Sequence, residues 1–270
     1  MKRGTLNISE PKAKSQFLWK YFDIHRFIYF LTEEKLFFTR LDKFEDPYEG
    51  VATKVLREQV KLNEQLHTSA DLKKTKGRAA KYIKQVLIKT IETGIPNQII
   101  EKQKRQYVNC WFSGDRESMA MWNLYSSPDS VAIKVKFTNI KNELNESFKQ
   151  LIENNGNRIS IIGDEITYLE LNPFNPSLPK QNLKYSALKK DKPFEYENEY
   201  RFLIITIDRL DKVESFYTIP LDIEKLDLKI IAHPNMESWK YENINKLIEL
   251  LNKNFKLEKS KTILRGKNYS

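Results

Sequence analysis

Residues 189–205, Lys-Lys-Asp-Lys-Pro-Phe-Glu-Tyr-Glu-Asn-Glu-Tyr-Arg-Phe-Leu-Ile-Ile, carry the clearest structural pattern in the chain. If they form one strand, successive side chains point to opposite faces of a sheet, with aromatic and aliphatic side chains on one face. The other face then holds Glu195, Glu197, Glu199 and Arg201. Neighbouring carboxylates would lie roughly 6.6 Å apart, and at an effective dielectric constant of about 20 they would repel by about 2.5 kcal/mol.

Such a row of acids is either the solvated end of a strand or an arrangement that is retained for a function despite the repulsion between its charges. Two interpretations of Glu197 and Glu199 therefore stand side by side. The acids act in catalysis, or they form a structural ion-pair network with Arg201, Lys190 or Lys192.

Around this stretch, apolar spacing predicts alternating strands and helices. The expected strands cover residues 17–23, 35–39, 107–112, 131–137, 158–162, 166–169 and 228–233, with Gly163-Asp164 joining two of them. The expected helices cover residues 24–34, 119–124, 144–154 and 241–254. The sequence predicts a single α+β domain over residues 1–270, with a mixed, mostly antiparallel central sheet and a helical insertion at about 51–104.

The chain of 270 residues has a net charge of +10, which favours a polyanionic partner such as nucleic acid. The basic helices expected within residues 73–104 are the candidate contact surface, with Lys73, Lys74, Lys76, Arg78, Lys81 and Lys84. The same charge also fits a solvated helix face, or the Lys, Asn and Ile content that is typical of an AT-rich genome.

Several classes of protein are disfavoured by what the sequence lacks. It has no Gly-x-Gly-x-x-Gly or Walker loop, which argues against a standard nucleotide-binding fold. Cys110 is the only cysteine, and the first residues lack the apolar segment of a signal peptide, so we expect a cytoplasmic protein without membrane contact. His25, His67 and His233 are scattered and have no Cys or His at ligand spacing, so no zinc site is expected.

Three short motifs follow one another along the chain. The first is Leu-Phe-Phe-Thr-Arg-Leu-Asp-Lys-Phe-Glu-Asp-Pro-Tyr-Glu-Gly at 36–50. The second is Cys-Trp-Phe-Ser at 110–113 with Met-Trp-Asn-Leu-Tyr at 121–125, and the third is Phe-Glu-Tyr-Glu-Asn-Glu-Tyr-Arg at 194–201. Their order and spacing resemble the bacterial family called Domain of Unknown Function 2971, over roughly residues 17–265. Glu45 stands where that family usually has Asn, and Phe194 where it has Trp.

A more distant resemblance is to mono-ADP-ribosyltransferases. These enzymes have an Arg or His in an opening strand, a Ser or Thr on the second strand, and a late Glu-x-Glu pair. Here Lys20 or Tyr21, Thr39 and Glu197-x-Glu199 follow in that order. The opening Arg or His is absent.

That resemblance implies an NAD-using enzyme, such as a toxin or phage-defence effector, with NAD as substrate. Glu197 and Glu199 would be its catalytic acids, because a carboxylate stabilises the positive charge that develops on the ribose. The residues expected around the cofactor are Tyr21, Thr39, Arg40, Ser113, Trp122, Tyr125 and Arg201. Trp122 and Tyr125 could equally bury one face of a helix, and Ser113 could cap the following segment.

Two further functions are compatible with the same residues. One is a nucleic-acid-binding or metal-dependent nucleic-acid-processing module, with Asp46, Glu197 and Glu199 as magnesium ligands. In that case Asp46 would contact substrate or metal. The alternative is a structural role for Asp46 in a tight turn before Pro47. The other is a protein that binds a protein partner and has no enzymatic activity.

Overall fold

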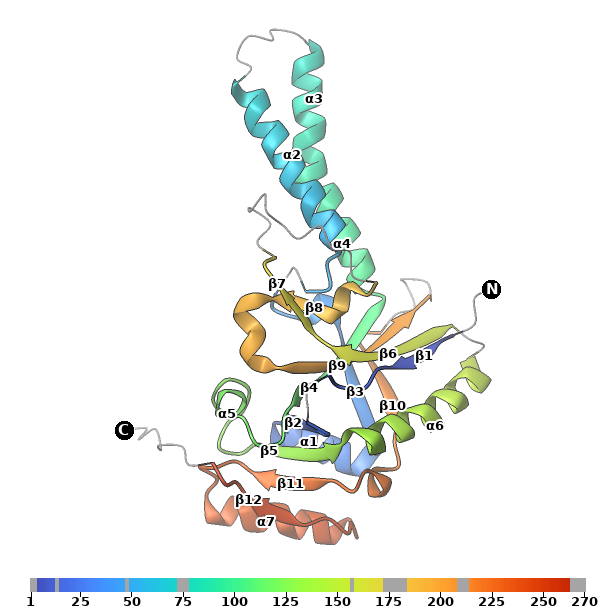
Figure 1. Cartoon of the computed structure of the whole chain (residues 1–270), viewed down its shortest axis with the longest axis vertical. Helices are drawn as coiled ribbons and strands as arrows, with labels where there is room; N and C mark the ends of the chain where they lie inside the picture. Colours follow the sequence, from blue (N-terminus) through green and yellow to red (C-terminus); the bar gives the residue numbers. More distant parts are fainter. Residues whose placement is uncertain are drawn as a thin grey trace.

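The computed structural model describes residues 4–12, 15–46, 49–71, 78–155, 158–171, 184–207 and 214–262 (Figure 1). The strands are β1 (Leu6–Ile8), β2 (Phe17–Phe22), β3 (Lys35–Arg40), β4 (Gln106–Ser113), β5 (Val131–Lys136), β6 (Ile159–Glu165), β7 (Thr167–Leu169), β8 (Lys189–Asp191), β9 (Glu199–Thr206), β10 (Phe216–Pro220), β11 (Lys229–Ala232) and β12 (Leu257–Lys259). The α-helices are α1 (Ile24–Glu33), α2 (Thr53–Asp71), α3 (Arg78–Lys89), α4 (Ile95–Gln103), α5 (Met119–Tyr125), α6 (Phe137–Asn155) and α7 (Ser238–Leu250). Shorter helical turns are η1 (Leu41–Lys43), η2 (Thr90–Gly94), η3 (Ser186–Leu188), η4 (Lys192–Glu197) and η6 (Ile223–Leu226).

The strands of the described chain assemble into one ten-stranded sheet and a small β7–β8 pair. Its main path runs β1-β6-β9-β4-β2-β5-β11-β12. Only β1–β6 and β11–β12 pair in parallel, and the other pairs in this sheet are antiparallel. The prediction of an α+β fold with a mixed, mostly antiparallel sheet is confirmed.

The sheet divides along one edge of β4. The end of β4 pairs with β2 through Ser113 and Phe112, whereas its beginning pairs with β3 through Val108 and Tyr107. Between these two pairings, residues 109–111 of β4 have no strand partner on that edge among the described residues. Because β2 and β3 diverge from β4 here, the sheet has an internal opening next to its centre.

The larger hydrophobic core lies on one face of this sheet. Tyr200, Phe202 and Ile204 of β9 point into it and are fully buried. Helices α1, α6 and α7 cover the same face with buried apolar side chains such as Phe30, Phe148 and Ile244. On the opposite face, a smaller cluster joins β4 and β9 to η1 and η3.

The helical insertion is present between β3 and β4, with α2 beginning at Thr53 and α4 ending at Gln103. Figure 1 shows α2 and α3 as a hairpin that projects away from the sheet. Its base has a small apolar cluster of its own, in which Val55, Leu56 and Ile95 are buried. Helices α2 to α4 lie within residues 51–104, where the sequence predicts a helical insertion.

The acidic stretch is not one strand. β8 ends at Asp191, the next six residues form the 3₁₀ turn η4, and β9 begins at Glu199. Pro193 fits the first turn of η4, and Asn198 ends that turn in the left-handed region with φ of 39°. The predicted alternation is correct only from residue 199 onward.

Other predicted boundaries shift for identifiable reasons. Gly163 and Asp164 do not form a turn: both pair with β9, and the break in the strand falls at Ile166. The short strands β1, β10 and β12 are not predicted by periodicity because each is only three to five residues long. In the described part of the chain, none of the helices has the length and apolar character needed to cross a membrane.

Candidate functional site

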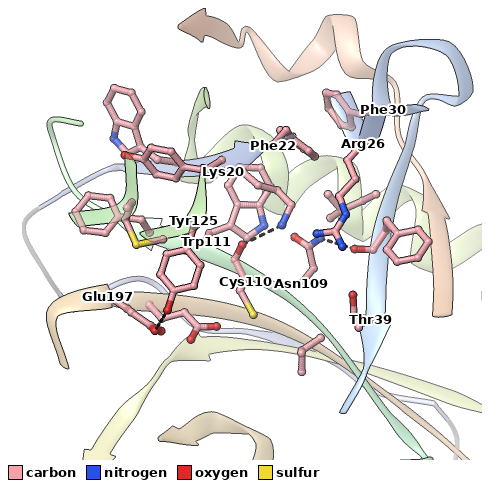
Figure 2. A pocket seen from close by; sticks show the side chains of 18 of the residues that line it. Lys20, Phe22, Arg26, Phe30, Thr39, Asn109, Cys110, Trp111, Tyr125 and Glu197 are labelled. Carbon is pink, nitrogen blue, oxygen red and sulfur yellow. Dashed lines mark hydrogen bonds between the residues drawn. The ribbon is translucent and has the colours of Figure 1, made fainter. Parts of the chain in front are cut away.

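A cleft of about 560 Å³ occupies the opening in the sheet (Figure 2). Its walls come from β2, β3 and the unpaired edge of β4, and it is covered by α1, α5 and η4. Aromatic side chains dominate the lining, which includes Tyr21, Phe22, Phe37, Trp111, Phe112 and Tyr125. A few polar groups lie among these rings, which is the usual composition of a small-molecule site.

Two carboxylates line one end of the cleft. Glu197 accepts a hydrogen bond from the Tyr125 hydroxyl and another, of 2.6 Å, from the Lys190 ammonium. The Lys190 Nζ also lies 3.9 Å from Glu199, so one cation bridges the two acids. Both carboxylates are almost completely buried. Although burial lowers the pKa of Lys190, Glu199 and the other carboxylates nearby outweigh it, so this pKa is raised above its ordinary value.

Glu199 belongs to a buried ion network with Arg201 and Glu49. The Arg201 guanidinium donates to both Glu199 oxygens, at 2.7 and 2.9 Å, and a third donor reaches Glu49 at 2.6 Å. It also donates to the Ala187 carbonyl at 2.7 Å. Burial would raise the pKa of Glu199, but Arg201 and then Lys190 reverse this effect and hold the pKa below its ordinary value.

The same network connects the site to the insertion. Gln103, at the end of α4, donates a 2.8 Å hydrogen bond to the Glu49 backbone carbonyl, and both side chains are buried. Glu49 in turn accepts from Arg201, which holds Glu199. The turn before α2 and the end of α4 are therefore fixed to β9 directly behind the cleft.

The deeper part of the cleft contains a buried amine. The Lys20 ammonium donates to the Cys110 carbonyl at 3.0 Å and lies 5.6 Å from the centres of the Phe22 and Trp111 rings. Burial lowers the pKa of Lys20 to about 8. Burial likewise raises the pKa of the Cys110 thiol, so this thiol stays protonated and unreactive.

Five of the residues expected at the site from sequence line the cleft. These are Tyr21, Thr39, Tyr125, Glu197 and Glu199. Tyr21 accepts a hydrogen bond from the Ser118 amide and meets Trp122 edge-on, with ring centres 4.8 Å apart. Its position links the opening strand β2 to α5.

The other expected residues lie outside the lining. Arg40 pairs with Asp42 at 2.5 Å and donates to the Glu214 carbonyl, away from the cleft. Trp122 is fully buried behind Tyr21, where its indole donates to Glu117 at 2.9 Å. Ser113 is buried at the end of β4, and Arg201 is buried in the ion network described above.

Asp46 lies in a different hollow, between the turn after η1 and helix α4. The three acids considered as magnesium ligands are therefore not brought together. Among the residues that the structure describes, no group of three or more His, Cys, Asp or Glu side chains could hold a metal ion.

The lining also includes residues that the sequence did not place at the site, among them Arg26, Asn109 and Trp111. Lys190 was expected only as an ion-pair partner of the two acids, and it pairs with both. Asn109 offered a signal, because it is a polar residue at an inward position of β4 between Tyr107 and Trp111. A buried amide in an apolar strand needs partners for its donors and acceptor. The opening in the sheet explains why a polar residue is tolerated at position 109. That opening follows from how the strands pair, which the local sequence does not show.

Residues 121–202 match the model of DUF2971, a protein family of unknown function. The chain resembles this family. The match begins within α5 and extends through Glu197, Glu199 and Arg201, so it includes one side of the cleft and its carboxylate end. Comparison with curated proteins and with solved structures found no match.

Proposed function

We propose that the cleft binds NAD and that the chain is an ADP-ribosyltransferase-like enzyme that breaks the nicotinamide–ribose bond. One observation carries the proposal: Glu197, Glu199 and Tyr125 meet Tyr21 and Thr39 in a single aromatic cleft at the opening of the sheet. These residues come from four separate segments of the chain. The motifs that suggested this chemistry from sequence are thus adjacent in space.

The chemistry follows from the ionised carboxylates. When the C1′–N1 bond breaks, its electron pair leaves with nicotinamide and the ribose becomes an oxocarbenium-like cation. A carboxylate next to the ribose stabilises this cation electrostatically. An acceptor hydroxyl then attacks C1′ and loses its proton to a base, which completes the transfer.

Glu197 is the better candidate for contact with the ribose. Its partners are a tyrosine hydroxyl and a lysine, and a ribose hydroxyl can replace the Tyr125 hydroxyl without leaving a buried charge unpaired. Glu199 is held by both arms of Arg201 and has less freedom to change partners. We therefore assign contact with the ribose to Glu197. Glu199 holds the neighbouring charges of the site in place through its pair with Arg201.

The test is release of nicotinamide from NAD, together with transfer of label from NAD carrying labelled adenine. We expect Glu197→Gln and Glu199→Gln to abolish both signals while the chain stays folded. Glu195→Gln is the matched control, because Glu195 is exposed on the same turn and does not line the cleft. Absence of turnover with protein, nucleic-acid and water acceptors would overturn the proposed enzymatic activity, and absence of NAD binding would overturn the assignment of the cleft as well. The biological role of a toxin or phage-defence effector stays a prediction.

A second candidate function is nucleic-acid binding by the projecting hairpin. Lys73, Lys74 and Lys76 lie outside the described residues, and so does the side chain of Arg78. Lys81 and Lys84 are exposed on α3, and Tyr82 between them is 68% exposed. Exposed lysines with an aromatic ring suit contact with phosphates and a base.

This candidate has its own test in the double variant Lys81→Glu/Lys84→Glu. We expect the wild type to bind RNA or DNA with an affinity that falls as salt rises, and the variant to bind less tightly at low salt. In a gel-shift assay at low salt, wild type and variant that shift every nucleic acid to the same extent, or not at all, would exclude this function for the hairpin. Neither result changes the expectation for NAD.

A further inference from the structure

Two buried polar atoms in the cleft lack the partners that such atoms normally have. Asn109 and Trp111 are each only 2% exposed. Within the described part of the chain, neither the Asn109 Oδ1 nor the Trp111 Nε1 has a hydrogen-bond partner. A buried polar group without a partner is costly, so its presence needs a physical reason.

The orientation of the Asn109 amide is fixed by its other end. Its Nδ2 donates to the Phe37 carbonyl at 2.6 Å, across the opening between β4 and β3. The acceptor oxygen must therefore point away from β3. Asn109 and Trp111 are two residues apart on β4, so their side chains lie on the same face of the sheet.

Lys20 extends from β2 toward the same place. Figure 2 shows its amino end between the Asn109 amide and the Trp111 indole. That end donates its hydrogen bond to the Cys110 carbonyl. The Lys20 Nζ lies 5.6 Å from the centre of the Trp111 ring, and both Asn109 and Trp111 line the cleft.

We propose that Asn109 Oδ1 and Trp111 Nε1 form a subsite that binds the amide or amidine edge of a flat heterocycle. Such an edge presents an N–H to Asn109 and an acceptor to Trp111, and the neighbouring Phe22 and Tyr29 rings complete an apolar slot. This deepens the proposed function and rests on it, because NAD carries two groups of this kind. They are the carboxamide of nicotinamide and the edge of adenine.

The experiment uses purified full-length chain and calorimetric titration with NAD, ADP-ribose and nicotinamide mononucleotide. Trp111→Phe and Asn109→Ala each remove one of the two atoms. Trp122→Phe is the matched control: Trp122 is also buried, but it does not line the cleft and its N–H is paired with Glu117. A melting curve for each variant confirms that it is folded.

We expect Trp111→Phe and Asn109→Ala to weaken binding by about tenfold, the effect of one lost hydrogen bond. A loss for NAD and nicotinamide mononucleotide alone identifies the carboxamide, whereas a loss for NAD and ADP-ribose alone identifies adenine. Trp122→Phe should bind all three like the wild type.

Unchanged affinities in both cleft variants would overturn the subsite and leave the proposed function standing. Nucleotide binding that weakens as expected, but without nicotinamide release by the wild type, would support the subsite and overturn the proposed function. If the wild type binds none of the three compounds, both are overturned.

Discussion

Glu199 and Arg201 lie on the same face of β9, where Glu199 lines the cleft and Arg201 holds it from outside the lining. Arg201 has no exposed surface, and its donors go to Glu199, Glu49 and a backbone carbonyl. A buried ion pair is weak evidence for stability, but removal of one partner leaves an uncompensated charge. We therefore expect Arg201 to affect the proposed activity through the position and ionisation of Glu199.

We expect Arg201→Met to lower the free energy of unfolding by about 3–5 kcal/mol at neutral pH, because Glu199 and Glu49 lose their shared partner. Urea unfolding monitored by circular dichroism measures the loss. The control is Lys192→Ala, whose pair with Glu170 is more than half exposed and should matter little. A variant as stable as the wild type would contradict the structural importance of the network.

The buried amine of Lys20 makes the stability of the fold depend on pH in the alkaline range. Its pKa in the folded chain is about 8, lowered from an ordinary value of 10.5. Between these two values the unfolded chain holds a proton that the folded chain has released, so this group alone makes stability rise with pH through the range. The penalty of burying the charge is present in full below about pH 8.

We expect Lys20→Met to make the slope of stability against pH less positive between about pH 8 and 10.5. Other groups still contribute, because burial also lowers the pKa of Lys189 to about 8, whereas burial raises the pKa of the Cys110 thiol and acts in the opposite direction. Urea unfolding of wild type and variant across the alkaline range gives the two slopes. Identical slopes would mean that Lys20 is solvated when folded. Lys261→Met, at an exposed site, should leave the slope as it is.

At the scale of elements, the turn between η4 and β9 positions the two acids. Asn198 adopts φ of 39°, and its side-chain amide donates to the Ser113 carbonyl on β4. This left-handed residue interrupts what would otherwise be a continuous strand. It separates Glu197, which ends the 3₁₀ turn, from Glu199, which starts β9.

We expect Asn198→Ala to destabilise the chain by about 2 kcal/mol, from the loss of the hydrogen bond and from backbone strain. Asn198→Gly should cost about 1 kcal/mol less, since glycine adopts this conformation freely. Thermal unfolding of the two variants measures the difference. An Ala variant at least as stable as the Gly variant would show that the turn is not strained.

Element type could be predicted from sequence more reliably than element limits. The strands of the core were predictable because β4, β5 and β9 have buried apolar runs bounded by polar residues. The acidic stretch was not, because period-two alternation continues through Pro193 and Asn198, which are the actual breaks. Those two residues are turn signals that the alternation overrode.

At the scale of the whole molecule, the site exists because β2 and β3 pair with different ends of β4. Local periodicity cannot show this pairing, so Lys20, Asn109 and Trp111 could not be assigned to one cleft from sequence. The lining does include four residues from separate motifs, Thr39, Tyr125, Glu197 and Glu199, whose roles stay predictions. Arg40 and Arg201 were expected there as substrate-binding cations, but each is paired within the protein.

The most direct measurement is calorimetric titration of NAD into Glu197→Gln and into the cleft-filling variant Thr39→Trp. The first variant keeps the cleft and lacks the carboxylate, so one NAD should bind per chain without being consumed. In the second, an indole projects from β3 into the space that NAD would occupy, and binding should be lost while the melting curve stays close to that of the wild type. Failure of Glu197→Gln to bind NAD, or equal binding by both folded variants, would contradict the assignment of this cleft.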